Sequence, residues 1–448
     1  MTVVLGFAQT KEYQTLNKKI KNKPVAVKNK HLGREGGVTG SGEAVGDVHG
    51  LNAGATGPWS PPKKILVIAG EASGDGHAAR VIAAIRAQEP RAEFFGIGGE
   101  AMAAQGVRLL RHASDLAVMG LSEVASRLGV VLRALRDVAR ALKTERPALV
   151  ILVDFPDFNF WVARLARFYR VPVMYYISPQ VWAWRTYRVR TIARLVDRMV
   201  VIFPFEADFY RARGVPVTHV GHPLMETLPI LSDRRALLAQ WGLDPARLTV
   251  ALLPGSRAGE IECHLPLMLA SAALIQQAVP QVQFVLPLAS TTPAELVKGM
   301  VKRWLGEGAG NRGSLAIISG QSYQALSAAH LAVVASGTAT VEAALAGTPT
   351  VIVYKVSPLT FRVARSLVRV DHVGMANLLA GERLFPELIQ DDFTPARLAK
   401  EVLDLIGDRE RLAAIRQGLA RVITRLKGPG ASARAAQVAL ELVAAGKQ

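Results

Sequence analysis

Short apolar segments recur along the chain, separated by longer segments in which apolar and polar residues follow helical spacing. Uninterrupted apolar segments are typical of parallel strands, because helices cover such strands on both faces. The segments that we interpret as strands in the first half are Ile65–Ala69, Glu93–Ile97, Leu149–Val153, Pro172–Ile177, Met199–Phe203 and a short strand that ends in VGHP. In the second half they are Leu248–Leu253, Gln283–Pro287, Leu315–Ile318, Leu331–Ala335 and Thr350–Tyr354.

This alternation of strands and helices predicts parallel sheets with helices on both faces. The pattern begins again after about Leu228, so we expect two doubly wound, Rossmann-like domains that face each other across a cleft. We place the first domain at 63–226 and the second, with the C-terminal helices, at 227–448. Residues 1–62 are rich in Lys, Gly and Asn, and we expect a disordered basic extension there.

The segment LVILVDFPDFN ends a predicted strand with two carboxylates. Asp154 follows the strand directly, and Pro156 is expected to hold Phe155 extended. Ligands of open α/β sheets bind beyond the carboxyl ends of the strands, where a carboxylate can act as a general base. The alternative is that Asp157 caps a helix from Phe158 onward and that Asp154 only accepts hydrogen bonds from turn amides.

A glycine-rich turn, GEASGDG, follows the first predicted strand. Ser73 or Asp75 would cap a helix over about 77–88, and the backbone amides at its start could hold a hydroxyl or a phosphate. Ser73, Gly74 and Asp75 are therefore candidate substrate-binding residues. Many α/β folds contain such a turn, so the turn alone does not identify a ligand.

Two turns of the second half are suited to a nucleotide diphosphate. Arg257, in PGSR, offers a fork of donors to phosphate oxygens. In SGTATVE, the amides and hydroxyls of Ser336, Gly337 and Thr338 open a helix where phosphate can bind. Glu342 is expected in the first turn, within reach of ribose hydroxyls. The alternative is that Ser336 caps this helix and that the carboxylate of Glu342 only offsets the helix dipole.

An amphipathic helix or helix pair is predicted over 118–142. Arginines occupy its polar positions, and a basic apolar helix of this kind suits an anionic membrane surface or an acyl chain. An ordinary helix that faces the core is the alternative. The apolar positions of the candidate membrane face are Leu121, Val124, Leu128, Val131 and Leu132.

Composition narrows the partners. The net charge of +18 favours a polyanionic partner, which means nucleic acid, anionic lipid or a phosphorylated substrate. No RNA-binding motif or zinc finger occurs, which argues against nucleic acid. The single cysteine, Cys263, excludes a disulfide framework and fits a reducing cytosol. Nine histidines show no metal-ligand spacing, so we expect no metal and no cofactor.

Over about residues 64–440 the chain resembles the lipid-A-disaccharide synthase family. The order and spacing of the shared motifs make the resemblance specific, and residues 1–62 lie outside it. The motifs are GEASGD at 70–75, AVMGLSEV at 117–124, DFPDFN at 154–159, ISPQVWAWR at 177–185, FPFEADFY at 203–210, VGHP at 220–223, LLPGSRAGEIE at 252–262, SGTATVE at 336–342 and NLLAG at 377–381.

The resemblance implies an inverting, metal-independent GT-B glycosyltransferase that joins UDP-2,3-diacylglucosamine to 2,3-diacylglucosamine 1-phosphate (lipid X). The products would be UDP and a β-1,6-linked disaccharide 1-phosphate for lipid A. Asp154 would be the base and Arg257 would matter for activity, while Glu342 and Asn377 match donor-nucleotide positions. The enzyme would be cytoplasmic and peripheral on the inner face of the cytoplasmic membrane. Whether it forms a homodimer is left open.

Two rival interpretations remain at this point. A nucleic-acid or membrane-binding protein could use the charge of +18 and the Trp182/Trp184 loop without any chemistry. Affinity for nucleic acid that collapses with salt would favour that protein. The second rival is another UDP-sugar enzyme of the GT-B fold, such as an N-acetylglucosaminyl transferase or an epimerase, which has no need of an exposed apolar patch at 118–135.

Overall fold

The computed structural model describes residues 62–117, 124–183, 185–229, 233–289, 292, 294–305, 314–358, 361–362, 372–426 and 428–446. The predicted basic extension therefore lies outside the described residues, apart from Pro62. Leu121 and Trp184 also lie outside them.

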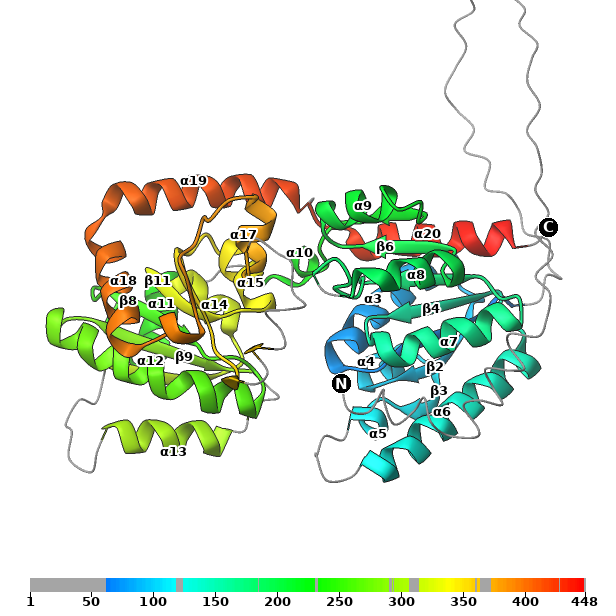
Figure 1. The fold of residues 1–448 in the computed structure, drawn as a ribbon, viewed down its shortest axis with the longest axis horizontal. Coiled ribbons are helices and arrows are strands. Elements are labelled where there is room, and N and C mark those ends of the chain that lie inside the picture. The colour runs from blue at the N-terminus through cyan, green and yellow to red at the C-terminus, as the bar shows by residue number, and fades with distance from the viewer. Residues whose placement is uncertain are drawn as a thin grey trace, which may run out of the picture. The chain divides into compact units, whose positions relative to one another are not determined.

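The first sheet has the strand order β3-β2-β1-β4-β5-β6-β7 (Figure 1). Register is parallel wherever it is defined, for example between Ile65 of β1 and both Phe94 of β2 and Leu149 of β4. The strands are β1 (Lys64–Ala69), β2 (Glu93–Gly98), β3 (Arg108–His112), β4 (Leu149–Val153), β5 (Val173–Tyr176), β6 (Arg198–Val201) and β7 (Val217–His219).

The second sheet repeats this plan with the order β10-β9-β8-β11-β12-β13. Its central strands are fully buried, which explains their uninterrupted apolar sequences. The strands are β8 (Thr249–Leu253), β9 (Gln283–Leu288), β10 (Leu315–Ser319), β11 (Leu331–Ala335), β12 (Thr350–Tyr354) and β13 (Glu387–Ile389). The prediction of two doubly wound parallel α/β domains is confirmed.

Helices separate the strands in sequence. In the first half they are α3 (Ala72–Gln88), α4 (Glu100–Ala104), α5 (Ser114–Ala117), α6 (Val124–Glu145), α7 (Pro156–Phe168), α8 (Val189–Leu195), α9 (Pro204–Arg211) and α10 (Leu224–Thr227). In the second half they are α11 (Arg234–Gln240), α12 (Ala258–Ala278), α13 (Ala294–Leu305), α14 (Ser322–Ala328), α15 (Thr338–Leu345), α17 (Met375–Ala380), α18 (Pro395–Gly407), α19 (Arg409–Arg425) and α20 (Ala431–Ala445).

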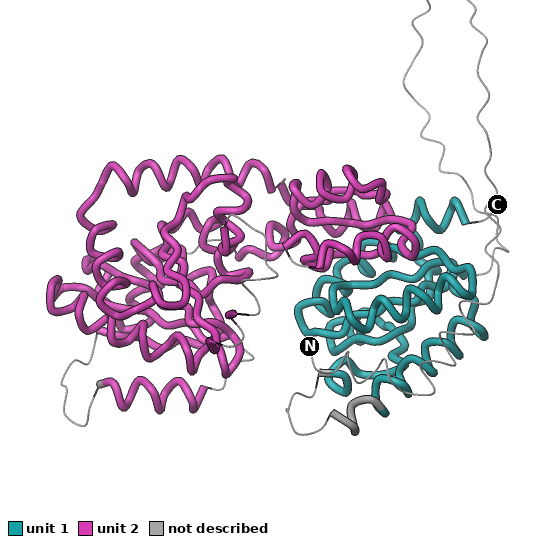
Figure 2. The backbone as a smooth tube through the Cα atoms, viewed as in Figure 1, with its two compact units in different colours: residues 1–174, 439–448 teal, residues 175–438 magenta. Residues whose placement is uncertain are grey.

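The chain divides into two compact units, residues 1–174 with 439–448, and residues 175–438 (Figure 2). The predicted border at 226 differs from this division, although it does separate the strands of the two sheets. It stays a prediction. Within the second unit, the last helix is tied to the β7 region, because Arg434 Nε donates to the Val220 carbonyl at 2.7 Å. Ser432 N donates to the Glu226 carboxylate, also at 2.7 Å.

One described helix, α12, has the length and composition of a membrane span. Its residues Ile261, Leu265, Met268 and Ile275 are buried in the protein, and the helix packs along α18. The predicted strands Leu331–Ala335 and Thr350–Tyr354 form β11 and β12, and the helix expected to open within SGTATVE lies between them as α15.

Candidate active site

The first sheet reverses its strand order between β1 and β4, which is where open α/β sheets bind ligands. Ala69 of β1 pairs with Val153 of β4, so the residues that follow the two strands meet at one edge. These residues are Gly70 to Asp75 and Asp154 to Asp157. The structure therefore brings together two of the motifs predicted to carry chemistry in the first unit.

Asp154 lies on a strained turn. Its φ is +45° and that of Phe155 is +48°, so two consecutive residues with side chains are left-handed. The expectation that Pro156 holds Phe155 extended is wrong, because Phe155 is the left-handed N-cap and the proline is the first residue of α7. Proline's fixed φ and missing N–H suit that first helical position.

Asp157 does not cap the helix. It is exposed and lies in the first turn of α7, where a carboxylate still offsets the helix dipole. Asp154 is half-buried and lies before the helix begins. Its position at the end of β4 matches the one predicted for a base.

The turn after β1 differs from its prediction. Helix α3 begins at Ala72 with Glu71 as N-cap, so neither Ser73 nor Asp75 caps it. Ser73 is exposed in the first turn, and Gly74 is buried against Val153 and Ala69. The role of Ser73 and Gly74 in substrate binding stays a prediction.

Asp75 has a structural task. It is 5% exposed, and Oδ1 accepts from the N–H groups of Gly99 at 2.7 Å and Met102 at 3.2 Å. Oδ2 accepts from Ala101 N at 2.9 Å. The carboxylate thus holds the start of α4 and is not directed at solvent. Two residues further along α3, burial and the neighbouring Arg80 lower the pKa of His77 to about 4.

A polar cluster missed by the sequence predictions lies beyond β5 and β6. Glu206 is 2% exposed and accepts from Trp182 Nε1 and from Phe203 N, each at 3.2 Å. Burial raises the pKa of its carboxyl to about 8. Phe205 packs edge-on to Trp182 with ring centroids 4.9 Å apart. Glu206 stands three residues after Phe203, the N-cap of α9, which is the spacing of the glutamate in a capping box and is visible in the sequence.

The second sheet has its own switch point between β8 and β11. Arg257 follows β8 and is the N-cap of α12. Gly255 has a φ of +116°, and the Glu260 side chain accepts from Ser256 N at 3.2 Å. The Arg257 side chain is 71% exposed and lies 3.3 Å from Glu260 Oε1.

The turn after β11 carries the other residues that were predicted to bind the UDP-sugar donor. Gly337, not Ser336, is the N-cap of α15, while Gly337 and Thr338 are exposed. Glu342 lies in the second turn of α15, not the first. Burial raises the pKa of its carboxyl, and none of the described residues donates a hydrogen bond to it.

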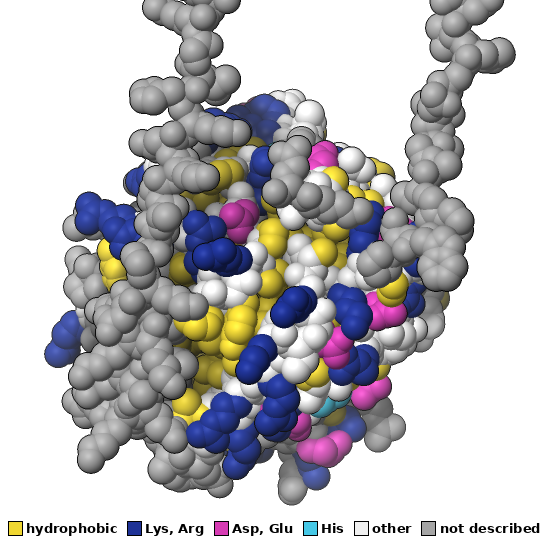
Figure 3. All heavy atoms as spheres, turned by 90° about the vertical axis from the view of Figure 1, so that its right-hand side faces the viewer, with side chains coloured by type: hydrophobic (Ala, Val, Ile, Leu, Met, Phe, Trp, Pro, Cys, Tyr) yellow, Lys and Arg dark blue, Asp and Glu magenta, His cyan; other side chains and the backbone are white. Residues whose placement is uncertain are grey.

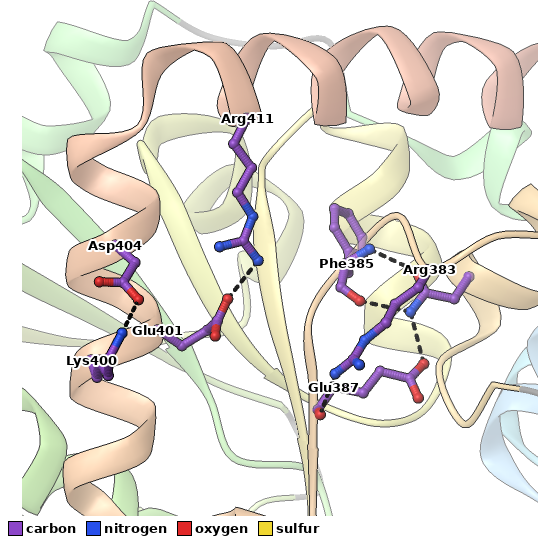
Figure 4. A network of polar contacts seen from close by, with 8 residues as sticks. Arg383, Phe385, Glu387, Lys400, Glu401, Asp404 and Arg411 are labelled. Carbon is purple, nitrogen blue, oxygen red and sulfur yellow. Dashed lines mark hydrogen bonds and ion pairs between the residues drawn. The ribbon is translucent and has the colours of Figure 1, made fainter.

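Asn377 is fully buried in α17, and its side chain makes hydrogen bonds to two neighbouring residues. Nδ2 donates to the carbonyl of Phe385 and to Glu387 Oε1, both at 2.8 Å, and Oδ1 accepts from Phe385 N at 2.7 Å. Glu387 also accepts from Val373 N, whose carbonyl accepts from Ser336 Oγ at 2.9 Å. Figure 4 shows Phe385 and Glu387, the two residues that Asn377 contacts. Asn377 therefore supports the Ser336 turn, and a direct contact with the nucleotide stays a prediction.

His264 was not singled out in the sequence. It is fully buried in α12, donates from Nδ1 to the Pro254 carbonyl at 2.8 Å and accepts at Nε2 from Lys355 N at 3.0 Å. It links the PGSR turn to the end of β12. A buried histidine seven residues after Arg257 has no distinctive sequence signal.

The candidate membrane face lies on α6 and is described only in part. Val131 and Leu132 are half-buried, and the side chains of Val124 and Leu128 lie outside the described residues. Leu135 and Val138, farther along α6, belong to the core. Figure 3 shows one face of the molecule on which apolar side chains lie beside many Lys and Arg side chains.

Among the described residues, no group of three His, Cys, Asp or Glu side chains has the arrangement of a metal site. Metal independence stays a prediction.

Comparison with known families decides the identity. The model of the family described as lipid-A-disaccharide synthetase matches residues 65–442. The chain belongs to the lipid-A-disaccharide synthase family. The family member from Syntrophus aciditrophicus (strain SB) is 45% identical over 381 residues, covering 85% of this chain and 98% of that protein. The member from Geobacter metallireducens is also 45% identical, over 86% and 98%.

Solved structures agree on the fold. UDP-GlcNAc 2-epimerase from Neisseria meningitidis, bound to UDP-GlcNAc, has a TM-score of 0.59 at 13% identity and covers 84% of this chain and 100% of its own. The glycotransferase of kitacinnamycin has a TM-score of 0.55 at 15% identity, covering 86% and 100%. At such identities the likeness shows the fold alone, and that fold is GT-B.

Proposed function

We propose that the chain transfers 2,3-diacylglucosamine from UDP to the 6-hydroxyl of 2,3-diacylglucosamine 1-phosphate (lipid X). The products are UDP and the β-1,6-linked lipid A disaccharide 1-phosphate. Membership of the lipid-A-disaccharide synthase family supports this reaction. The observation that carries the mechanism is the carboxylate of Asp154 on a strained turn at the first switch point.

In the proposed reaction, Asp154 takes the proton of the acceptor 6-hydroxyl as its oxygen attacks the anomeric carbon of the donor. The bond from that carbon to the UDP oxygen breaks, and UDP leaves with the electron pair. Attack from the face opposite the leaving group inverts the anomeric centre. A positioned base of this kind contributes about 10²–10⁴-fold to the rate.

The donor half of the mechanism is assigned to the second switch point. Arg257 and the amides at the start of α15 would offset the charge that develops on the leaving diphosphate. The exposed Arg257 can reach a phosphate without first leaving a buried ion pair. Glu342 would accept hydrogen bonds from ribose hydroxyls, which would compensate for the burial of its carboxylate.

Incubation of the protein with both lipid substrates tests the function. We expect UDP release that requires both lipids, with formation of the disaccharide 1-phosphate seen by mass spectrometry. A control with UDP-GlcNAc replacing the diacylated donor should release much less UDP, because it has only an acetyl group at the 2-nitrogen and no acyl group at the 3-oxygen. Release without lipid X, or epimerisation of UDP-GlcNAc, would favour the rival UDP-sugar enzymes.

We further propose that the protein is cytoplasmic and binds peripherally to the inner face of the cytoplasmic membrane. The net charge of +18 and the basic apolar character of α6 support this location. Replacing Val131 and Leu132 with Ser should weaken co-sedimentation with phosphatidylglycerol vesicles and leave melting nearly unchanged. Leu135→Ser is the matched control, because it introduces a hydroxyl into the core and should lower the melting temperature sharply. If both changes destabilise the fold equally, the face is core and the membrane proposal fails.

A further inference from the structure

The turn between β4 and α7 has an unusual backbone that requires support. Asp154 and Phe155 both have φ near +45°, at +45° and +48°. Residues with side chains rarely adopt this conformation, and it persists only where the surroundings enforce it. No glycine occurs at either position, so the support must come from neighbouring groups.

Asn159 supplies one such support. Its side chain is fully buried in α7, and Nδ2 donates to the carbonyls of Asp154 at 2.6 Å and Val153 at 3.3 Å. Its backbone N–H donates to the Phe155 carbonyl at 3.1 Å. The side chain thus holds two successive carbonyls of the turn, while the backbone bond to Phe155 is the ordinary i→i−4 bond at the start of the helix. Oδ1 is buried and accepts no hydrogen bond in the described part of the chain, so the side chain gives its hydrogen bonds to the turn alone.

Gly70 supplies the other support, from the end of β1. A Cβ built on Gly70 would lie 2.2 Å from Cδ1 and 2.4 Å from Cγ of Phe155. The Phe155 ring therefore fills the space that any side chain at position 70 would occupy. Phe158 adds a tilted ring contact at 5.7 Å between centroids. The absence of a side chain at Gly70 lets the ring dock, which helps hold Phe155 in its left-handed conformation.

We propose that Asn159 and Gly70 are positioning residues for Asp154. Asn159 holds the carbonyls on both sides of the base, and Gly70 admits the ring of the next residue. Together they fix where the carboxylate points. The inference rests on the proposed role of Asp154 as the base, and neither Asn159 nor Gly70 is assigned a contact with substrate.

The first experiment is a double-mutant cycle on turnover. Asn159→Ala should lower kcat by about 10–100-fold through a displaced base, while the KM for the UDP-sugar changes less than about twofold. In the Asp154→Asn background, Asn159→Ala should have almost no further effect, because the group it positions is gone. Asn159→Asp keeps the shape but replaces the donor with a carboxylate, and it serves if the alanine variant does not fold.

The second experiment perturbs the turn from the other side. Gly70→Ala should also lower kcat about tenfold or more, since its methyl would displace the Phe155 ring. Adding Phe155→Ala removes the clash and should recover part of the loss relative to Gly70→Ala alone. Gly299→Ala in α13, where an added Cβ meets nothing within 4 Å, is the matched control and should have wild-type turnover.

The outcomes distinguish the proposed role of Asp154 as the base from the positioning role of Asn159 and Gly70. If Asp154→Asn turns over normally, the base assignment fails, whatever Asn159 does. If Asp154→Asn is inactive while folded Asn159→Ala or Asn159→Asp and Gly70→Ala keep full kcat, the positioning inference is overturned. A loss from Asn159→Ala that persists at full size in the Asp154→Asn background also overturns it, because the residue then acts independently of the base.

Discussion

The turns that carry Asp154 and Arg257 solve the same geometric problem in opposite ways. Both lead from a central strand into a helix at a switch point. The Arg257 turn uses Gly255 for its left-handed residue and leaves the arginine 71% exposed. The Asp154 turn uses no glycine, is held by a buried asparagine and leaves the carboxylate half-buried.

This difference suits two different tasks. A base must stay within hydrogen-bond reach of one hydroxyl, so a rigid turn that limits its movement is useful. A cation that meets a diphosphate gains from adjusting to it, and an exposed arginine retains this freedom at little cost to stability. The turn proposed to hold the base is thus strained, whereas Gly255 reduces the strain in the turn proposed to bind the diphosphate.

The largest expected effect comes from removing the base. Asp154→Asn keeps the shape of the side chain but cannot take the proton, so turnover should fall by about 10²–10⁴-fold. The affinity for UDP, measured by calorimetry, should stay close to normal. Asp157→Asn is the control and should cost mainly stability, by roughly 0.3–1 kcal/mol, because the charge lies at the start of α7. A folded, inactive Asp157→Asn beside an active Asp154→Asn would reverse the assignment.

A smaller loss is expected at the donor turn. Arg257→Ala should cost about 2–3 kcal/mol of transition-state stabilisation, seen as a fall in kcat/KM. Arg257→Lys should recover only part, because an ammonium cannot replace the guanidinium fork. The melting temperature should hardly change, since the side chain is mostly in solvent. Unchanged turnover and UDP affinity in Arg257→Ala would remove this residue from the mechanism.

The third effect is on stability and concerns a buried capping carboxylate. Burial raises the pKa of Glu206 to about 8, so the folded state keeps its proton while the unfolded state loses it above about pH 4.5. Folding stability should therefore fall as pH rises from about 4.5 to 8, by at most about 1.4 kcal/mol per pH unit. Glu206→Gln should remove this slope in urea titrations at several pH values. Glu260→Gln, at the equivalent position of α12, measures the loss of a capping carboxylate near solvent. A slope that survives in Glu206→Gln belongs to other groups.

The smallest expected effect is that of chelation. Arginine and helix amides would supply the positive charge at the diphosphate, so EDTA should leave the rate of UDP release unchanged. Loss of activity with recovery on adding Mg²⁺ or Mn²⁺ would instead make Asp154 and Asp157 ligands. The contrast between a rigid base and a mobile binding cation would then have to be abandoned.

Much of the fold could be predicted because parallel strands are apolar throughout. Strands such as Leu149–Val153 and Leu331–Ala335 were predicted with their exact ends. Strands β3 and β13 were missed. Strand β13 has only three residues, and β3 contains Arg108, Arg111 and His112, which interrupt the apolar pattern. Helix starts were less predictable. At Phe155 the tertiary packing against Gly70 overrides the extended preference of a residue before proline.

Candidate residues were predictable where the residue type itself carries the chemistry. Asp154 and Arg257 follow central strands as predicted, and the turns that carry them lie at the two switch points. The supporting residues could not be found in this way. Asn159 and His264 are ordinary members of helices in sequence, and only the fold brings their side chains to the carbonyls that they hold. The same limit applies to Asp75, whose amide partners lie more than twenty residues away.

The bonds that tie α20 to the β7 region have a consequence during synthesis. Glu226 and Ser432 are separated by 206 residues in sequence, and Val220 and Arg434 by 214. A ribosome adding about 5–20 residues per second needs roughly 10–40 s to make the intervening chain. Throughout that interval the carbonyl of Val220 and the carboxylate of Glu226 lack these partners on the nascent chain. These contacts are therefore made only after the last helix has left the exit tunnel.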